Sequence, residues 1–193
     1  MKFAVIVVDM HKDALKGSPD NLLVQQRRAL IPRIKFLVDE ARKLNGVIVF
    51  ALDSYFEKDF LFKGKLRPFA IRGTKGAELI NEFEVHSEDI NLPKRRFSAF
   101  FRTDLDITLR TLDLDTIAVA GINTDVCVFS TAIDGICNDF NVVVISDCAA
   151  ARNPEIHEKM ISILSDTSTY PLLRVRTAEE FLVEAKENRI LEV

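Results

Sequence analysis

The segment GINTDVCVFSTA (residues 121–132) places Cys127 shortly after an apolar run that ends in glycine. Asn123 or Thr124 is suited to a helix N-cap, so we expect the thiol in the first turn of a helix. The positive end of the helix dipole favours a thiolate there, and the free N–H groups of such a turn can stabilise an oxyanion. Alternatively, Cys127 is a small apolar core residue, and this segment alone leaves both interpretations open.

Two distant segments carry side chains that could act together with this thiol. Asp9 ends the apolar run FAVIVVD, where it is either a general base or a loop-starting cap. Lys94, in LPKRRFSAFF, either belongs to a solvated basic turn or points into a site and holds a carboxylate ionised. An aspartate, a lysine and a cysteine that converge would form a candidate site for nucleophilic chemistry.

The elements that must position these residues alternate regularly along the chain. Six apolar runs predict strands over residues 3–9, 47–52, 89–92, 116–121, 141–146 and 172–176. Amphipathic patterns predict helices over residues 32–45, 75–83, 104–112, 124–138, 154–165 and 177–187. Continuously apolar strands indicate a parallel sheet covered on both faces, so we predict an α/β three-layer sandwich. Such sheets bind ligands at the carboxyl ends of their strands, where Asp9, Lys94 and Cys127 stand.

Composition excludes several classes of protein. The 193 residues are 48% hydrophobic and 28% charged, which predicts a single globular domain over 1–193. A net charge of −3 does not favour binding to nucleic acid or to an anionic membrane, and no apolar run reaches the roughly 20 residues that span a bilayer. The first strand is too short for a secretory signal, so we expect a cytoplasmic protein. Cys137 and Cys148 are interpreted as reduced packing residues.

One irregular segment, residues 53–76, is longer than a connection between two elements needs to be. Loops of this length are usually functional or belong to an oligomer interface. Together with 14 phenylalanines, this segment favours a homo-oligomer.

Taken together, the three segments resemble the isochorismatase-like cysteine hydrolase superfamily, which includes nicotinamidases and N-carbamoylsarcosine amidases. The likeness rests on Asp9 after the first strand, on K-x-R-[YF]-S-A-F with Lys94, and on G-[IV]-x-T-D-x-C-V-x-x-T-A with Cys127. Residues 72–80 (RGTKGAELI) resemble the G-T-x-G-A-E segment of the family. The resemblance implies a Rossmann-like parallel sheet of about six strands in the order 3-2-1-4-5-6. It also implies a dimer or a tetramer.

The resemblance further implies roles for individual residues. Asp9 would take the proton of Cys127, and Lys94 would keep Asp9 ionised and oriented. The thiolate would attack a small-molecule amide or N-carbamoyl (ureido) substrate, form a thioester and release ammonia. A cis peptide bond is implied between Ile122 and Asn123, and the backbone N–H groups of Asn123 and Cys127 would form the oxyanion hole.

Two histidines that hold the metal of nicotinamidases are missing from this chain, although the aspartate of the same motif is present as Asp53. The resemblance places a D-x-H motif after the second strand and another histidine before the G-T-x-G segment. Here residues 53–55 read D-S-Y, and Phe69 stands where the other histidine would fall. We interpret His11 as a loop residue, His157 as a helix-surface residue and His86 as part of a solvated segment. We therefore expect no metal and no other cofactor, and an activity like that of N-carbamoylsarcosine amidases, with nicotinamidase as the alternative.

Aromatic residues could form the wall of a substrate pocket, although each could equally be a core residue. The candidates are Tyr55, Phe62, Phe69 and Phe97. A different class of hypothesis keeps the fold and drops the chemistry, giving a non-catalytic ligand-binding or scaffold protein. The presence of aspartate, lysine and cysteine together argues against it.

Overall fold

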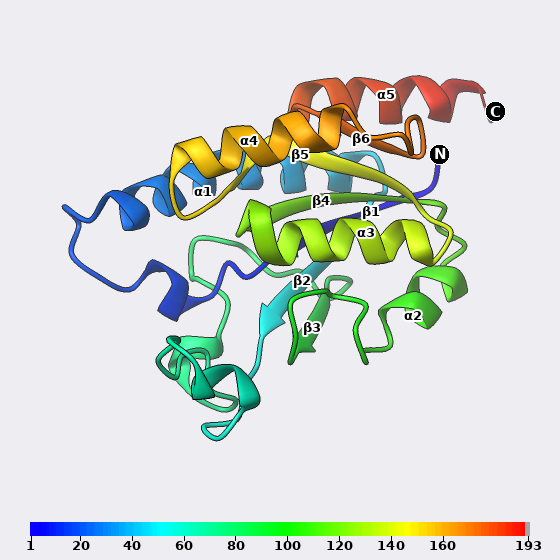
Figure 1. The fold of residues 1–193 in the computed structure, drawn as a ribbon. Coiled ribbons are helices and arrows are strands. Elements are labelled where there is room, and N and C mark those ends of the chain that lie inside the picture. Colours follow the sequence, from blue (N-terminus) through cyan, green and yellow to red (C-terminus); the bar gives the residue numbers. More distant parts are fainter. Residues whose placement is uncertain (192–193) are drawn as a thin grey trace.

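A six-stranded parallel sheet forms the centre of the computed structural model, which describes residues 1–191 (Figure 1). The strands lie in the order β3-β2-β1-β4-β5-β6, and every neighbouring pair is parallel. They are β1 (Phe3–Val8), β2 (Val47–Asp53), β3 (Ile90–Lys94), β4 (Thr116–Ile122), β5 (Asn141–Ala150) and β6 (Leu173–Arg176). The predicted α/β class and strand order are confirmed. Residues 192–193 of the expected domain over 1–193 lie outside the described residues.

Helices cover both faces of this sheet. One face carries α1 (Leu22–Lys43) and α5 (Ala178–Leu191), and the other carries α2 (Leu105–Thr111), α3 (Phe129–Cys137) and α4 (Pro154–Ser165). Val5 and Val7 of β1 pack into the core under α1 and α5, whereas Ala4 and Ile6 belong to the core on the opposite face. Burial on both faces explains why this strand is continuously apolar, as the three-layer sandwich requires.

The first helix begins earlier than predicted, at Leu22 instead of Pro32. Asn21 caps it, because the side chain of Asn21 accepts a 2.9 Å hydrogen bond from the N–H of Leu23. Pro32 therefore lies inside the helix, where a proline removes one backbone hydrogen bond at a cost of about 3 kcal/mol. Burial of side chains such as Val24 in the first half of the helix outweighs this local cost.

The predicted helix over 75–83 is also wrong, because only Lys75–Ala77 forms a short 3-10 turn. The chain that follows is extended and pairs with the segment after β1. The N–H of Lys12 donates a 2.9 Å hydrogen bond to the carbonyl of Glu78. Backbone bonds to another part of the chain override the helical pattern and place this segment beside the exit of β1.

β4 approaches β1 very closely at Gly121. This glycine has a φ of +111°, and a Cβ atom on it would lie 2.1 Å from the backbone oxygen of Val8. Only a residue without a side chain fits both the conformation and the contact. The carboxyl end of β4 is thereby held next to that of β1, where Asp9 follows.

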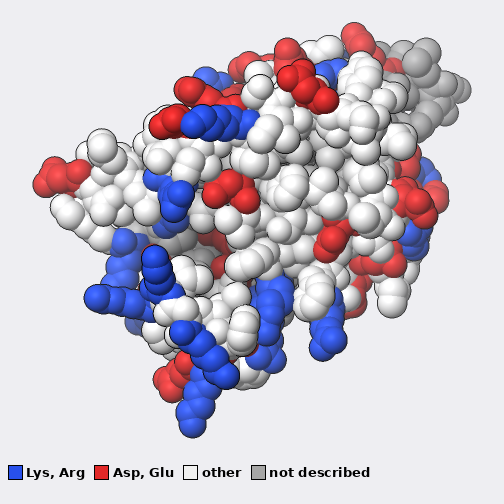
Figure 2. All heavy atoms as spheres, in the orientation of Figure 1, with Lys and Arg blue, Asp and Glu red and all other residues white. Residues whose placement is uncertain are grey.

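Lysine and arginine side chains gather over residues 53–76, at the lower end of the view in Figure 2. The exposed basic residues of this segment are Lys58, Lys63, Lys65, Arg67, Arg72 and Lys75. Of its three acidic residues, Asp53 and Asp59 are buried, and only Glu57 is exposed. This surface is thus locally positive although the chain carries a net charge of −3. None of the described helices is both long and apolar enough to cross a bilayer.

Candidate active site

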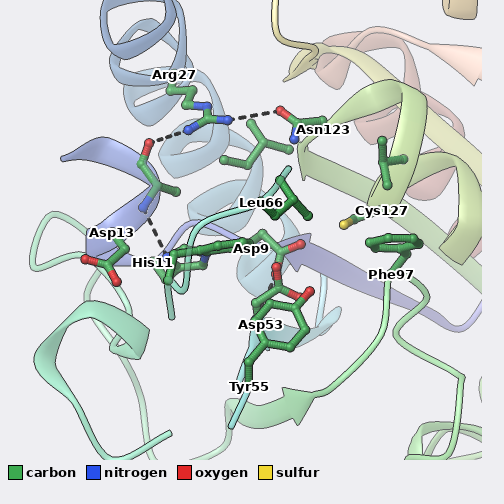
Figure 3. A pocket seen from close by; sticks show the side chains of 14 residues that line it. Asp9, His11, Asp13, Arg27, Asp53, Tyr55, Leu66, Phe97, Asn123 and Cys127 are labelled. Carbon is green, nitrogen blue, oxygen red and sulfur yellow. Dashed lines mark hydrogen bonds between the residues drawn. The ribbon is translucent and has the colours of Figure 1, made fainter. Parts of the chain in front are cut away.

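Three strand ends bring the predicted residues together at the carboxyl edge of the sheet, and Figure 3 shows Asp9 and Cys127 there beside Asp53. Asp9 directly follows β1, Lys94 is the last residue of β3, and Cys127 lies in the turn after β4. The strand between β1 and β3 adds Asp53, which pairs with Lys94 in the β2–β3 ladder. All four residues are buried, with exposed fractions of 6% or less.

The ammonium group of Lys94 links two carboxylates. Its Nζ donates to Oδ2 of Asp9 at 2.8 Å and to Oδ1 of Asp53 at 2.6 Å. The backbone N–H of Asp53 donates to the remaining oxygen of Asp9 at 2.8 Å. Every charged group in the cluster therefore has a partner, as burial of charges requires. Sequence reasoning considered Asp53 only as a remnant of a metal motif and missed this role.

Cys127 lies in a short π-helical turn, Thr124–Val128, instead of the regular helix start that the sequence predicts. The carbonyl of Asn123 accepts a 3.1 Å hydrogen bond from the N–H of Val128, five residues on. The peptide bond between Ile122 and Asn123 is cis, at the position that the resemblance implies. Single π-helical turns recur at functional sites.

Neither residue expected to cap this turn does so. Asn123 occupies the cap position, but its side chain makes no capping hydrogen bond. The hydroxyl of Thr124 instead lies 2.8 Å from Nδ1 of His157 on α4. His157 is therefore not a plain helix-surface residue, since it is half-buried and joins α4 to the cysteine turn.

The thiol of Cys127 lies within reach of the carboxylate cluster. Side-chain atoms of Asp9, Asp53 and Cys127 that could each offer a ligand all lie within 4.8 Å of one another. Burial raises the pKa of Asp9 to about 7, and the charge of Asp53 adds to this effect, while Lys94 opposes it. A carboxyl group with this pKa can accept and return a proton near neutral pH.

The pKa of the Cys127 thiol is raised well above its usual value, first by burial and then by the negative charge of Asp9. This contradicts the expectation that the helix dipole makes the resting thiol a thiolate. Desolvation outweighs the dipole, whose effect at a helix end is about 0.3–1 kcal/mol. Burial also disfavours the charged form of Lys94, but the charges of Asp9, Cys127 and Asp53 hold its pKa above the ordinary value.

A pocket with a volume of about 370 Å³ opens in front of Cys127 and Asp9. Three of the four predicted aromatic residues, Tyr55, Phe69 and Phe97, line it, together with Leu66. Phe62 does not line it, and instead packs edge-on behind Tyr55 and Phe69, with ring centroids 5.5 Å and 5.9 Å away. The volume suits a small molecule.

Two polar residues of the pocket wall were not predicted. His11, expected in a loop, is 2% exposed and stacks on Phe69. Its Nδ1 accepts a hydrogen bond from the N–H of Ala14, so Nε2 carries the proton, and burial lowers the pKa of the ring to about 4. Arg27, on α1, also lines the pocket and has no sequence signal, because only the packing of α1 brings it near Asn123.

The residues at the metal position of nicotinamidases do not fit a metal. Tyr55 and Phe69, which stand where the resemblance places histidines, pack edge-on with centroids 5.3 Å apart. The Asp53 carboxylate is bound to Lys94, whose ammonium occupies the cation position between the two carboxylates.

The sheet has the strand order that the resemblance implies, and Asp9, Lys94 and Cys127 are buried at its carboxyl edge. The family model for the isochorismatase domain matches residues 3–178. The chain belongs to this family of hydrolases.

Several known proteins are similar to this chain over most of its length. It is 31% identical over 191 residues to the uncharacterised isochorismatase family protein YwoC of Bacillus subtilis, covering 96% of this chain and 95% of that protein. It is 31% identical over 165 residues to a probable inactive nicotinamidase of Arabidopsis thaliana, covering 80% and 83% of the two chains. It is 29% identical over 180 residues to the ureidoacrylate amidohydrolase RutB of Pantoea ananatis, covering 81% and 72%.

Two solved structures share the fold over more than nine-tenths of each chain. An isochorismatase-like hydrolase from Alkaliphilus metalliredigens superimposes with a TM-score of 0.83 at 30% identity, covering 95% of this chain and 99% of that one. The N-carbamoylsarcosine amidase of Thermoplasma acidophilum superimposes with a TM-score of 0.79 at 25% identity, covering 93% and 98%.

Proposed function

We propose that this protein cleaves the C–N bond of a small amide or N-carbamoyl compound and releases ammonia. The observation that carries the proposal is the buried cluster of Asp9, Lys94 and Cys127 at the end of a pocket sized for a small molecule. Similarity to an N-carbamoylsarcosine amidase and to a ureidoacrylate amidohydrolase supports this reaction type.

The reaction begins with a proton transfer inside the cluster. Asp9 takes the proton of the Cys127 thiol as Sγ attacks the carbonyl carbon, and the carbonyl electron pair moves onto the oxygen. We assign the backbone N–H groups of Asn123 and Cys127 to that oxyanion. Asp9 then gives the proton to the departing nitrogen, so the C–N bond breaks, ammonia leaves and a thioester remains.

Water completes the cycle by the same proton path. Asp9 takes a proton from water, the resulting hydroxide attacks the thioester carbon, and the C–S bond breaks. The proton returns to the sulfur of Cys127, and a carboxylic or carbamic acid leaves. Lys94 keeps its charge throughout, which is consistent with its raised pKa and its contact with Asp9.

An ammonia-release screen over small amides and N-carbamoyl compounds tests this proposal. We expect one or more compounds to be hydrolysed, with Cys127→Ala lowering kcat at least about a thousandfold. Cys137→Ala is the matched control, because Cys137 is exposed and lies outside the pocket. Treatment with a chelator should leave the activity unchanged.

A non-catalytic protein of the same fold is the second candidate, favoured by the similarity to a probable inactive nicotinamidase. If no compound releases ammonia, or if Cys127→Ala hydrolyses as fast as the unmodified protein, the catalytic proposal is wrong.

A further inference from the structure

Arg27 presents a half-buried positive charge to the pocket without a carboxylate partner. Its Nη1 donates to the carbonyl oxygen of Ala14 at 2.6 Å, and its Nη2 donates to Oδ1 of Asn123 at 3.3 Å (Figure 3). Its Nε is buried and has no hydrogen-bond partner in the described part of the chain. Among residues 1–191, no aspartate or glutamate forms an ion pair with this guanidinium.

The carboxylates that line the same pocket already have partners. Asp9 and Asp53 are bound to Lys94. Asp13 also lines the pocket, and its carboxylate accepts a 2.9 Å hydrogen bond from the N–H of Ala70 and packs against Gly76. Burial lowers the pKa of Arg27 and the charge of Asp9 opposes this from a distance. None of these carboxylates forms an ion pair with Arg27, so no described anion contacts the guanidinium at this end of the pocket.

The remaining donors of Arg27 match a carboxylate. A guanidinium carries five N–H groups, and Ala14 and Asn123 each use one on an Nη atom. One N–H remains on each Nη, in addition to the buried N–H of Nε. A planar fork of this kind binds the two oxygens of a carboxylate side by side. A desolvated cation without a partner is unfavourable, so an anionic ligand group is the complement that this end of the pocket favours.

Arg27 lies close enough to Cys127 for one small molecule to contact both residues. Arg27 contacts Asn123, which stands one turn before Cys127, and all three line a single pocket of about 370 Å³. A small substrate with its carbonyl at Sγ therefore reaches the guanidinium with another part of the molecule.

The surface around the mouth of the pocket is also positively charged. Leu66 lines the pocket and is half exposed, and its neighbours Lys65 and Arg67 are both exposed. These belong to the positive surface over residues 53–76 (Figure 2). Positive charge around a cleft raises the local concentration of anions.

We propose that Arg27 is a specificity-determining residue that binds a carboxylate of the substrate, so that the substrate is a carboxylated amide or N-carbamoyl compound. This inference rests on the function proposed above, because Arg27 would bind the end of the same substrate that does not react with Cys127. The alternative role for Arg27 is that of a brace between Ala14 and Asn123. A brace would act equally on charged and neutral ligands.

Binding to the Cys127→Ala protein separates the two roles, because this variant retains the pocket and lacks the nucleophile. The probes are N-carbamoylglycine, N-carbamoyl-β-alanine and succinamate, each paired with the compound whose carboxylate is replaced by a carboxamide. Isothermal titration calorimetry should give a Kd at least about tenfold lower for one or more acids than for the paired carboxamide. Arg27→Gln, added to Cys127→Ala, should abolish this ratio, and Arg27→Lys should restore part of it.

Arg28→Gln is the matched control, since it removes the same charge from an exposed neighbour outside this pocket, and it should leave the ratio unchanged. The inference is overturned if no acid binds better than its carboxamide, including the case in which nothing binds. It is also overturned if Arg27→Gln weakens acid and carboxamide equally. The proposed function is judged separately: ammonia release from neutral amides by the protein with Cys127 intact would uphold it even if Arg27 proved to be a brace.

Discussion

The backbone N–H of Asp53 donates a 2.8 Å hydrogen bond to the carboxylate of Asp9. This bond fixes one oxygen of Asp9, and the ammonium of Lys94 fixes the other. Because Lys94 also contacts the carboxylate of Asp53, one ammonium group is paired with two carboxylates. Burial, and after it the excess negative charge of the cluster, raises the pKa of Asp9 to about 7. This carboxyl group is therefore suitable as a proton acceptor near neutral pH.

Replacing Lys94 with methionine should destabilise the protein and abolish its activity. The substitution leaves two carboxylates buried without a cation, and breaking a buried pair in this way typically costs about 3–5 kcal/mol. Urea denaturation followed by circular dichroism measures the free energy of unfolding. Lys159→Met is the control, because Lys159 forms an exposed pair with Glu155 and should cost less than about 1 kcal/mol. Equal losses in the two variants would contradict the assigned role of Lys94.

The rate of hydrolysis should fall as the solution becomes more acidic than pH 7. Asp9 accepts a proton only when it is ionised, and its pKa is raised to about 7 by burial and by Asp53. Below that pH, kcat/KM should decrease by about a factor of ten per pH unit. Asp9→Asn should be inactive at every pH. A kcat/KM that stays constant from about pH 5 to pH 8 would show that a carboxyl group with this pKa is not the base.

Asp9 and His11 should affect the pH dependence of stability in opposite directions. The folded-state pKa of Asp9 is raised from 3.8 to about 7, so its contribution to stability is lost as the pH rises through that range. The folded-state pKa of His11 is lowered from 6.5 to about 4, so its contribution increases as the pH rises through that range. In the unmodified protein the two effects oppose each other.

Replacing either residue should therefore leave the contribution of the other residue to the pH dependence of stability unopposed. The unfolding free energy is measured by urea denaturation at about pH 5 and pH 6. His11→Gln removes a contribution that rises with pH, so the slope of the unfolding free energy against pH should become more negative than in the unmodified protein, by up to about 1.4 kcal/mol per pH unit. Asp9→Asn should shift the slope by a similar amount in the opposite direction. Slopes that change with the same sign in both variants would contradict the assigned protonation states.

Gly121→Ala should disrupt the junction between β1 and β4. The new Cβ atom would lie 2.1 Å from the backbone oxygen of Val8, in a conformation with φ of +111°. We expect a loss of more than about 2 kcal/mol in the free energy of unfolding. Gly64→Ala is the control, because the nearest atom to its Cβ would be 3.9 Å away, and it should change stability little. A Gly121→Ala protein as stable as the control would refute the close contact.

The sheet and the three central residues are predictable from the sequence for a simple physical reason. Strands buried on both faces must be continuously apolar, and the carboxyl ends of neighbouring parallel strands meet at one edge. Asp9 and Cys127 follow such runs, and Lys94 ends the less apolar edge strand β3, so their convergence can be inferred without coordinates.

Other features depend on contacts between distant segments. The start of α1 was predicted too late because Pro32 suggests a helix start, and only packing shows that the helix accommodates it. The role of Asp53 depends on its register with Lys94, and that of Arg27 depends on how α1 lies against the turn at Asn123. The protonated thiol of Cys127 results from burial, which no local motif reveals.

The most direct test of the proposed chemistry is the mass of the protein during turnover. A hydrolysed compound from the ammonia screen is mixed with the protein, the reaction is quenched in acid, and the intact mass and the peptides are measured. The proposal predicts an added mass equal to the substrate minus ammonia, located on the peptide that contains Cys127 and absent from Cys127→Ala. Continued hydrolysis with no adduct on Cys127 at any time, or an adduct on Cys137 or Cys148, would contradict it.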